Sequence, residues 1–278
     1  MSEHHEKVPR DWRIPDELWE RIVPLLPPRK AHPLGCHRPR VDDRKAMDAI
    51  FFVLRTGCQW NALNETGICS SSSAHRRFQE WVEADVFVAL WEKGLEEYEA
   101  LQGVDWEWLA MDGAMTKAPL GGKKVGKNPT DRGKLGTKRS VLTDGRGVPL
   151  GLAVDGTNRN DCKMARATIA SIAVERPDAT PDRPQGLCLD KGYDYDEVRE
   201  LLDEFGFTAH IRARGEEAKA LKEEAGCKAR RWVVERTHSW MNRFRRVLIR
   251  WDKKACNYLG FLHLVCAYIT YRQAGLLR

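Results

Sequence analysis

This chain of 278 residues has no hydrophobic run long enough to cross a membrane. Its longest apolar stretch, residues 259–269, is interrupted by His263 and is far short of the roughly 20 residues that a membrane span needs. Residues 1–13 are polar throughout, so we expect no export signal. These absences argue against a membrane protein and predict a cytoplasmic one.

No Cys-x-x-Cys pair is present among the eight cysteines, and Cys188 and Cys266 lie in apolar runs. The spacing does not fit a zinc motif, and buried reduced thiols in a cytosolic protein are the better interpretation. The chain also has no internal repeat, and its one low-complexity segment is the serine run at 70–73. Repeat architectures are therefore excluded.

Charge is unevenly distributed along the chain. Lys and Arg number 46 against 40 Asp and Glu, for a net charge of +6 and a pI near 8.9. Residues 80–112 hold ten acids and one base (net −9), residues 117–139 eight bases and one acid (+7), and residues 228–254 ten bases and two acids (+8). Basic blocks with interleaved Trp and Phe suit a phosphate backbone, although they could equally solvate one face of a long helix.

The first part of the chain, 1–103, is predicted to be a helical DNA-binding region. Hydrophobic residues make up 42% of the chain, enough to bury a core, which excludes global disorder. Helical patterns occur at 16–26, 42–56, 72–82 and 86–98, with Ser72 as the expected cap of the third helix.

The next part, 104–254, has the order of strands and helices that predicts an α/β fold with a mixed sheet flanked by helices. A strand at 108–111 is expected to end at Asp112, and two β-prone runs at 139–143 and 148–154 predict a hairpin. The later elements are expected as a helix at 161–175, a strand at 186–189, a helix at 195–205, a strand at 207–212 and a loop or small insertion at 213–230.

The remaining part is expected to be helical from about residue 231, with a C-terminal helix at 255–278. One narrow apolar stripe is predicted on this helix, formed by Val233, Trp240, Phe244, Val247 and Trp251. Glu235 lies about 200° around the helix from that stripe. It is therefore expected on the opposite face.

Three acids are predicted to converge above the sheet. Asp112 and Asp190 are each expected at a strand end, and Glu235 on the helix after the last strand. Three carboxylates suit two Mg²⁺ ions about 3.5–4 Å apart, with Mn²⁺ as a substitute, and such a pair promotes in-line phosphoryl transfer. Structural interpretations remain for each: Asp112 precedes Gly as in a turn, Asp190 lies near a helix start, where Asp is common and Asp194 is the expected cap, and Glu235 could pair with Arg231 one helical turn earlier.

Sequence motifs around these acids resemble those of a known family. Leu-Leu-Pro-Pro-Arg at 25–29 and Leu-Arg-Thr-Gly-Cys-Gln-Trp at 54–60 are similar to the DNA-binding region of DDE-type transposases of bacterial insertion sequences, in the insertion-sequence family five group. Met-Asp-Gly at 111–113, Leu-Asp-Lys-Gly-Tyr-Asp at 189–194 and Arg-Trp-Val-Val-Glu-Arg-Thr at 231–237 resemble its acid-bearing segments. The resemblance covers nearly the whole chain. It implies a ribonuclease H-like fold with Asp112, Asp190 and Glu235 as the catalytic, metal-binding triad.

The chain departs from the family's signature around the third acid. That signature has Tyr three residues before the Arg and Lys seven residues after the Glu, whereas this chain has Lys228 and Asn242 at those positions. Arg231 and Glu235 fit the signature. The substrate contact of the missing Lys is therefore expected from Arg243 or Arg236.

Segment 72–81 is predicted to be a recognition helix, with His75, Arg76 and Gln79 facing outward toward base edges. The alternative is a helix that only packs in the bundle. Further expected DNA contacts are Arg38, Arg40, Arg44, Lys123, Lys124, Lys127, Arg132, Lys134, Lys138, Arg231, Arg236, Arg243, Arg245 and Arg246. His238 could touch a metal or a phosphate, or be a solvated helix side chain.

These features predict a bacterial, nucleoid-associated DNA transposase. It is expected to bind the terminal inverted repeats of its own insertion sequence, cleave the DNA ends and transfer the 3′-hydroxyl to target DNA. Joining two ends implies a homodimer or a higher assembly on DNA. Two alternatives stay open on the same fold: a metal-dependent nuclease that cuts without joining, and an inactive DNA-binding derivative.

Overall fold

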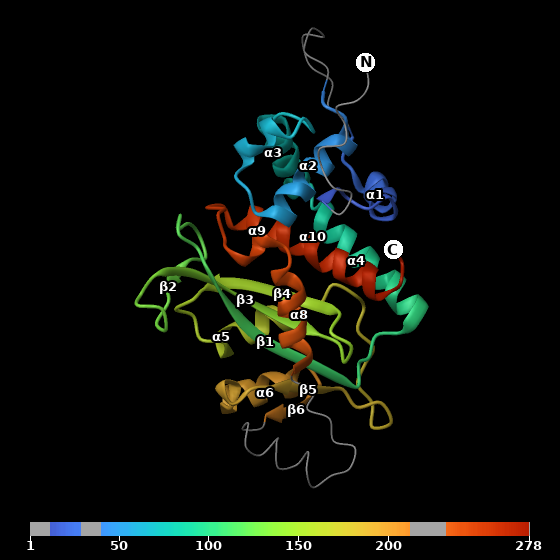
Figure 1. The fold of residues 1–278 in the computed structure, drawn as a ribbon. Coiled ribbons are helices and arrows are strands. Elements are labelled where there is room, and N and C mark those ends of the chain that lie inside the picture. Colours follow the sequence, from blue (N-terminus) through green and yellow to red (C-terminus); the bar gives the residue numbers. More distant parts are fainter. Residues whose placement is uncertain (1–11, 29–39, 212–231, 278) are drawn as a thin grey trace.

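The computed structural model describes residues 12–28, 40–211 and 232–277, in which helices pack above and below a mixed sheet (Figure 1). The N-terminal helices are α1 (Asp16–Ile22), η2 (Val23–Leu25), α2 (Asp43–Thr56), η3 (Trp60–Glu65), α3 (Ser71–Glu83) and α4 (Val86–Gln102). Helix α2 begins where Asp42 accepts from the Lys45 amide at 3.1 Å, and ends at Gly57, whose φ of 70° is left-handed. The four predicted helices are confirmed.

Helix α3 begins earlier than the sequence pattern predicts. The Ser70 side chain, not that of Ser72, accepts from the Ser73 amide, so the predicted cap is wrong. Asn64 also contributes, because its side-chain oxygen accepts from the Ser71 amide at 2.9 Å. A side chain seven residues away thus satisfies an amide of the first turn, which local spacing does not reveal.

The sheet has six strands: β1 (Trp108–Lys117), β2 (Gly126–Lys127), β3 (Leu135–Thr143), β4 (Pro149–Gly156), β5 (Gly186–Leu189) and β6 (Thr208–Ile211). Strand β1 is central, antiparallel to β3 on one side and parallel to β5 on the other. Strands β2 and β4 pair with β3, and β6 pairs in parallel with β5. This order is ribonuclease H-like, and it confirms the predicted hairpin and mixed sheet.

Strand β1 is longer than predicted. It does not end at Asp112 but continues to Lys117, because β3 pairs with it from Ala110 opposite Thr143 to Lys117 opposite Gly136. For the same reason β3 begins at Leu135 rather than at residue 139. The intervening Gly- and Lys-rich sequence has no periodic apolar pattern, so the pairing is set by the partner strand.

Helix α5 (Cys162–Ile169) is shorter than the predicted helix at 161–175. The chain leaves the helix because the Ala173 amide donates to the Leu150 carbonyl of β4 at 2.9 Å. Elements η4 (Lys191–Tyr193) and α6 (Asp196–Glu204) follow β5, and α6 and β6 agree with the predicted helix and strand. The loop expected at 213–230 lies outside the described residues.

The helix predicted from residue 231 onward is broken into α8 (Trp232–Asn242), α9 (Arg245–Leu248) and α10 (Ala255–Gln273). Between α9 and α10, Ile249 forms a bridge with Lys117 and the Arg250 amide donates to the Lys117 carbonyl at 2.8 Å. Backbone that pairs with the end of β1 cannot continue a helix. The predicted apolar stripe therefore does not lie on one helix, and Trp251 at its end is 41% exposed.

Helix α10 joins the N-terminal helices to the sheet. It packs along α4 and also contacts α3, β4 and α8 (Figure 1). Close approach depends on glycine: a Cβ on Gly260 would lie 2.5 Å from Val82 Cγ2, and one on Gly94 would lie 2.9 Å from the Tyr271 ring. One apolar core thus runs from α1 to α10. Within the described ranges, no helix is long and apolar enough to span a membrane.

We expect Gly260→Leu to lower the free energy of unfolding by about 1–3 kcal/mol, because the added side chain must displace Val82 in a packed core. Denaturant-induced unfolding measures the change. The matched control, Ala167→Leu, adds an apolar side chain at an exposed position of α5 and should change the free energy by less than about 0.5 kcal/mol. Equal effects at the two positions would contradict the close packing of α10.

Candidate active site

Asp112 lies on β1, and Asp190 directly follows the last residue of the adjacent parallel strand β5 with an extended backbone. The last printed pair between β1 and β5 joins Ala110 to Cys188, and each aspartate is two residues beyond its member of that pair. Parallel neighbours are about 4.8 Å apart, and side chains two residues apart point to the same face. The two carboxylates are therefore brought to the same edge and the same face of the sheet, and both residues are half-buried.

The pairing of β1 with β3 shows which face this is. Asp112 lies opposite Val141, and Ala114 lies opposite Arg139, so Asp112 and Arg139 share a face. The Arg139 side chain contacts α8, through His238 and Asn242. Asp112 is thus on the face of the sheet that α8 covers. Glu235 is a residue of α8 and lies on the same side of the sheet.

Three polar contacts fix α8 over this face. The Thr237 hydroxyl donates to the Gly147 carbonyl at 2.6 Å, in the turn between β3 and β4. His238 Nε2 lies 3.4 Å from the backbone oxygen of Asp112. Arg139 Nη2 donates to the Asn242 side-chain oxygen at 2.5 Å. Glu235 is one helical turn before His238, and its side chain is exposed.

Arg139 is the central cation of this arrangement and is only 1% exposed. Its guanidinium also reaches His238 Nδ1 and the Val247 carbonyl, each at 3.4 Å. Burial, and then the charge of Arg139, lowers the pKa of His238 to about 3, so the imidazole is neutral. We assign Nδ1 as the acceptor from Arg139 and Nε2–H as the donor to the Asp112 carbonyl, since one neutral tautomer satisfies both contacts.

The opposite face of the sheet holds a second polar group. Lys138 Nζ donates to Asp161 Oδ2 at 3.0 Å, and a Cβ on Gly113 would collide with Asp161 Oδ1. Burial, followed by the charges of Asp161, Asp112 and Asp190, raises the pKa of Tyr193 well above its ordinary value. Tyr193 is therefore a neutral phenol within electrostatic range of both predicted catalytic aspartates.

The donor chemistry of the site fits a divalent metal. Asp112 and Asp190 supply oxygen ligands only, which is what Mg²⁺ prefers. Among the residues that the structure describes, no three His, Cys, Asp or Glu side chains gather closely enough to hold a metal ion. Glu235 therefore does not complete a three-carboxylate site with the two aspartates in this structure.

Sequence patterns missed the residues that support the site. Arg139 was assigned only to a hairpin strand, and His238 was expected to touch a ligand or solvent, whereas it is 6% exposed between Arg139 and Asp112. Asp161 was assigned only to a helix. The sequence signal that could have indicated a buried cation here is Asn242, which stands where the family has Lys. A Lys at this position would bring a second cation next to Arg139.

The predicted DNA contacts of the N-terminal region have different surroundings. Arg76 is exposed on α3, Gln79 is half-buried, and His75 packs against the Trp60 ring. Arg40 pairs with Glu80 at 3.1 Å and Arg44 with Asp16 at 2.6 Å, so both already have carboxylate partners. Arg38, and Arg231 further along the chain, lie outside the described residues.

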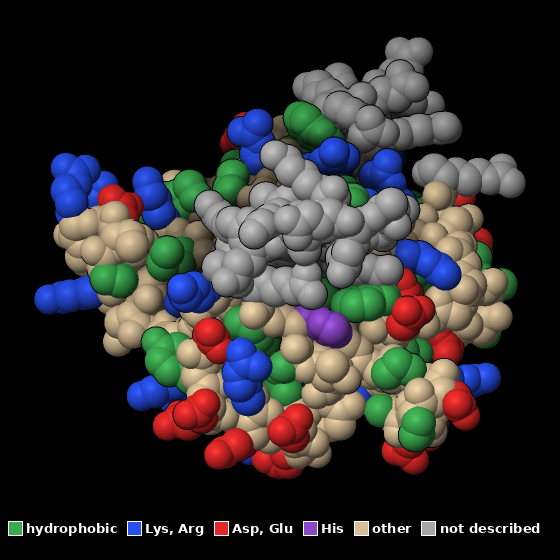
Figure 2. Space-filling view, turned by 90° about the horizontal axis from the view of Figure 1, so that it is seen from below, with side chains coloured by type: hydrophobic (Ala, Val, Ile, Leu, Met, Phe, Trp, Pro, Cys, Tyr) green, Lys and Arg blue, Asp and Glu red, His purple; other side chains and the backbone are tan. Residues whose placement is uncertain are grey.

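The basic residues around β2 form an exposed tract. Figure 2 shows Lys and Arg side chains gathered at the left margin, where Figure 1 places β2. The exposed residues here, called the β2 tract, are Lys123, Lys124, Lys127, Arg132 and Lys134. Lys138, expected among them, is 6% exposed and paired with Asp161, which corrects its assignment as a free phosphate contact.

The arginines after Glu235 do not share one helix face. Arg236 stacks on the rings of Trp232 and Trp240, at 4.5 and 4.8 Å. Arg243 and Arg245 are exposed. Arg246 is 4% exposed and pairs with Asp252 at 2.9 Å, so it stabilises the turn between α9 and α10 and is not available to a phosphate.

We expect Arg139→Lys to lower the free energy of unfolding by about 1–3 kcal/mol, because an ammonium cannot reach His238, Asn242 and Val247 together. Chemical denaturation measures the change. The control is Arg199→Lys at an exposed ion pair with Asp194, expected to change the free energy by less than about 0.5 kcal/mol. A small effect at Arg139 would show that the contacts do not hold α8.

Two curated relatives carry transposase names. The chain is 36% identical over 153 residues to a putative transposase for insertion sequence element IS402 of Burkholderia cepacia, which covers 54% of this chain and 70% of that protein. It is 24% identical over 137 residues to a putative transposase for insertion sequence element IS6501 of Brucella ovis, which covers 49% of this chain and 98% of that protein. Both similarities join this chain to proteins of bacterial insertion sequences.

The solved catalytic domain of Mos1 mariner transposase is also similar. Identity is 13% and the TM-score 0.29, over 68% of this chain and 92% of that one. A TM-score this low has no weight here. The fold assignment therefore rests on the strand order and directions of the sheet.

Two family models match the chain. The model described as a putative transposase of the IS4/5 family matches residues 14–91, which hold α1 to α3. The transposase DDE domain model matches residues 107–270, more than half of the chain and the whole sheet. This protein therefore belongs to the DDE transposase family, whose enzymes cleave DNA and transfer its strands.

Proposed function

We propose that this transposase binds the terminal inverted repeats of its own insertion sequence, cleaves the DNA ends and joins the resulting 3′-hydroxyl to target DNA. The observation that carries the proposal is that Asp112 on β1 and Asp190 directly after the adjacent strand β5 are brought to one edge of the sheet, on the side of the helix that carries Glu235. DDE transposases use divalent metal. The proposal includes action on DNA in the cytoplasm.

In this proposal, Asp112, Asp190 and Glu235 hold two Mg²⁺ ions, and Mn²⁺ substitutes for them. The metals would supply Lewis-acid activation of water or of the 3′-hydroxyl and stabilise the leaving oxygen. In this proposal the exposed Glu235 side chain turns toward the aspartates when metal and DNA bind, while the contacts of Thr237 and His238 hold its helix in place. Joining two ends requires two such sites, so a dimer or a higher assembly on DNA is part of the proposal.

We expect Asp112→Asn and Asp190→Asn each to reduce end cleavage and strand transfer at least about 100-fold, with DNA binding retained, because either change removes a metal ligand. The substrate is DNA from the element's own ends, and gel assays follow cleavage and joining in Mg²⁺, in Mn²⁺ and in chelator. Asp194→Asn, at an exposed residue four positions after Asp190, is the matched control and should keep activity.

An Asp112→Asn protein that is folded, binds DNA and still cuts would contradict the assignment of the site. A strand-transfer assay with pre-cleaved ends separates a transposase from a nuclease that only cuts. Wild-type protein that binds the ends but neither cuts nor joins them would instead indicate an inactive derivative.

We also propose that the β2 tract holds DNA phosphates next to the site. Neutralising Lys123, Lys124 and Lys127 together with Gln should reduce the slope of log affinity against log salt by about 3, since each lost phosphate contact changes it by roughly 0.9. Fluorescence anisotropy with duplex DNA at several salt concentrations measures the slope. Lys163→Gln, at an exposed residue of α5, is a single-charge control that should leave the slope unchanged. An unchanged slope in the triple variant would exclude the tract from the interface.

A further inference from the structure

The turn between β3 and β4, residues 144–147, has a conformation that one buried side chain fixes. The Asp144 carbonyl accepts from the Gly147 amide at 3.0 Å, and Gly147 has a left-handed φ of 89°. The side-chain oxygen Oδ1 of Asp144 accepts from the amides of Arg146 and Val148, at 3.0 and 2.8 Å. Asp at the first position of a tight turn shapes the backbone in this way, and glycine supplies the left-handed residue. The turn is therefore a rigid unit.

Helix α4 holds this turn from one side. The Tyr98 hydroxyl donates to Asp144 Oδ2 at 2.9 Å, and Arg146 Nη1 donates to the carbonyls of Gln102 and Gly103, at 3.3 and 3.2 Å. Burial, followed by the charge of Asp144, raises the pKa of Tyr98, so the hydroxyl keeps its proton and donates it. Asp144 is fully buried, and its oxygens therefore depend on these donors.

Helix α8 is attached to the other side of the turn, at the residues that directly follow Glu235. The Arg236 guanidinium donates to the Arg146 carbonyl, and the Thr237 hydroxyl donates to the Gly147 carbonyl at 2.6 Å. A Cβ on Gly147 would lie 3.0 Å from the Thr237 hydroxyl oxygen and 3.2 Å from the Arg236 guanidinium, so the approach is close. The position of the turn thus sets the position of the helix at Glu235.

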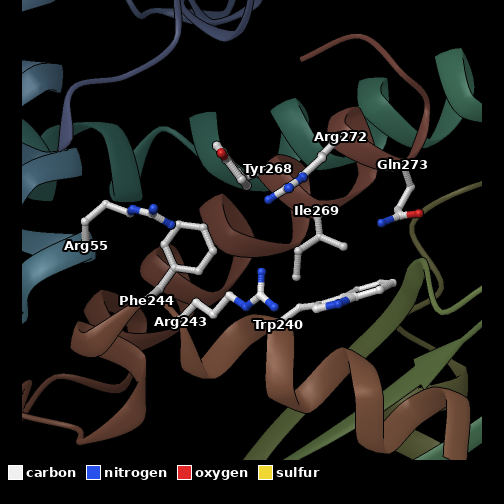
Figure 3. Close-up of a pocket in the computed structure, with 8 residues that line it drawn as sticks. All are labelled: Arg55, Trp240, Arg243, Phe244, Tyr268, Ile269, Arg272 and Gln273. Carbon is white, nitrogen blue, oxygen red and sulfur yellow. The ribbon is translucent and has the colours of Figure 1, made fainter. Parts of the chain in front are cut away.

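Aromatic rings hold Arg236 in the same arrangement. Its guanidinium lies 4.5 Å from the ring centroid of Trp232 and 4.8 Å from that of Trp240. The two tryptophans are four residues before and four residues after Arg236, so the three side chains share one face of α8. Trp240 also lines the cavity of about 250 Å³ between α8 and α10 (Figure 3). The Arg236 guanidinium therefore has two rings and a carbonyl of the turn as partners.

The supports of α8 come from two directions. Arg139 contacts the helix from the sheet, at His238 and Asn242, whereas the turn at 144–147 contacts it from the side of α4. Glu235 lies in the first turn of α8. Groups that hold a metal ligand from outside typically change metal affinity or activity about 10- to 100-fold when they are removed. A displacement of about 1 Å at a reacting group costs on the order of 100-fold in rate.

We propose that Asp144 and Tyr98 are positioning residues for Glu235: they hold the turn at 144–147, whose carbonyls fix the first turns of α8 above the sheet. The inference rests on the proposed function for the role of Glu235 as a metal ligand. It links the packing of the N-terminal helix α4 to the geometry of the metal site. It also assigns Arg236 to holding α8 rather than to a DNA phosphate.

The test measures binding of Mn²⁺ alone to the protein on pre-cleaved end DNA, from the electron paramagnetic resonance signal of the free ion, with binding to DNA alone subtracted. Thr237→Val removes the hydroxyl that donates to the turn and should weaken Mn²⁺ binding about 10-fold. Tyr98→Phe removes the donor to Asp144 and should weaken it at least about threefold. Thr237→Ser keeps the hydroxyl and should restore the affinity.

Two matched controls remove similar buried hydrogen bonds that do not involve the turn. Thr168→Val acts on a buried hydroxyl of α5 that donates to the Met164 carbonyl at 2.9 Å. Tyr271→Phe removes a buried phenol of α10 that donates to the Glu97 carboxylate. Both should change Mn²⁺ affinity by less than about twofold, because they are not connected to α8 through these bonds. Circular dichroism and thermal melting establish that each variant is folded.

A double-mutant cycle separates positioning of Glu235 from a general loss of stability. Glu235→Gln should weaken Mn²⁺ binding at least about 10-fold, and Thr237→Val should then change it by less than about twofold further. Equal losses from Thr237→Val in both backgrounds would overturn the inference.

The outcomes distinguish this inference from the proposed function. Loss of affinity in Glu235→Gln, with wild-type affinity in either Thr237→Val or Tyr98→Phe, would overturn the inference alone. Wild-type affinity in Glu235→Gln would contradict Glu235 as a metal ligand in the proposed function, and the inference would fall with it.

Discussion

The arrangement of the site depends on one buried cation. Arg139 on β3 contacts His238, Asn242 and the Val247 carbonyl, and so joins the sheet to α8 and to α9. Each of these acceptors is neutral, and removing any one of them would leave part of a buried guanidinium without a partner. The same constraint explains Asn242. The family's Lys at this position would place an ammonium beside Arg139, whereas an amide oxygen accepts its hydrogen bond.

Successive side chains of β1 point to opposite faces of the sheet, and this separates the carboxylate of Asp112 from the ion pair of Lys138 and Asp161. Asp112 points to the face under α8, where the contacts of Arg139 and His238 hold the helix against the sheet. The neighbouring Gly113 lies on the other face, where the buried Lys138 forms an ion pair with the half-buried Asp161. One face therefore carries the carboxylates that are proposed to bind metal, while the other face holds an ion pair that stabilises the strand. The neutral phenol of Tyr193 lies within range of the carboxylates on both.

Charge counts along the sequence overstated the charge available to DNA. Within the acidic segment 80–112, Glu80 pairs with Arg40, which precedes α2, and Glu97 pairs with Arg21 of α1. In the basic segment 228–254, Arg246 and Arg250 are buried and hold the turn between α9 and α10. The exposed positive charge that remains includes the β2 tract, Arg243 and Arg245. Ion pairing and burial depend on neighbours distant in sequence, so a linear count cannot anticipate them.

The sequence by itself determined the elements, the mixed sheet and the family, because periodic apolar spacing and the acid-bearing motifs are local signals. It indicated Asp112, Asp190 and Glu235 as candidates, although their catalytic role stays a prediction. Only the tertiary structure decided that β1 runs on to Lys117, that the last helix breaks after Asn242, and that Arg139 and His238 lie between β1 and α8. Each of these features depends on hydrogen bonds to a residue far away in the chain. The residues on either side of a position do not reveal which distant residue it will contact.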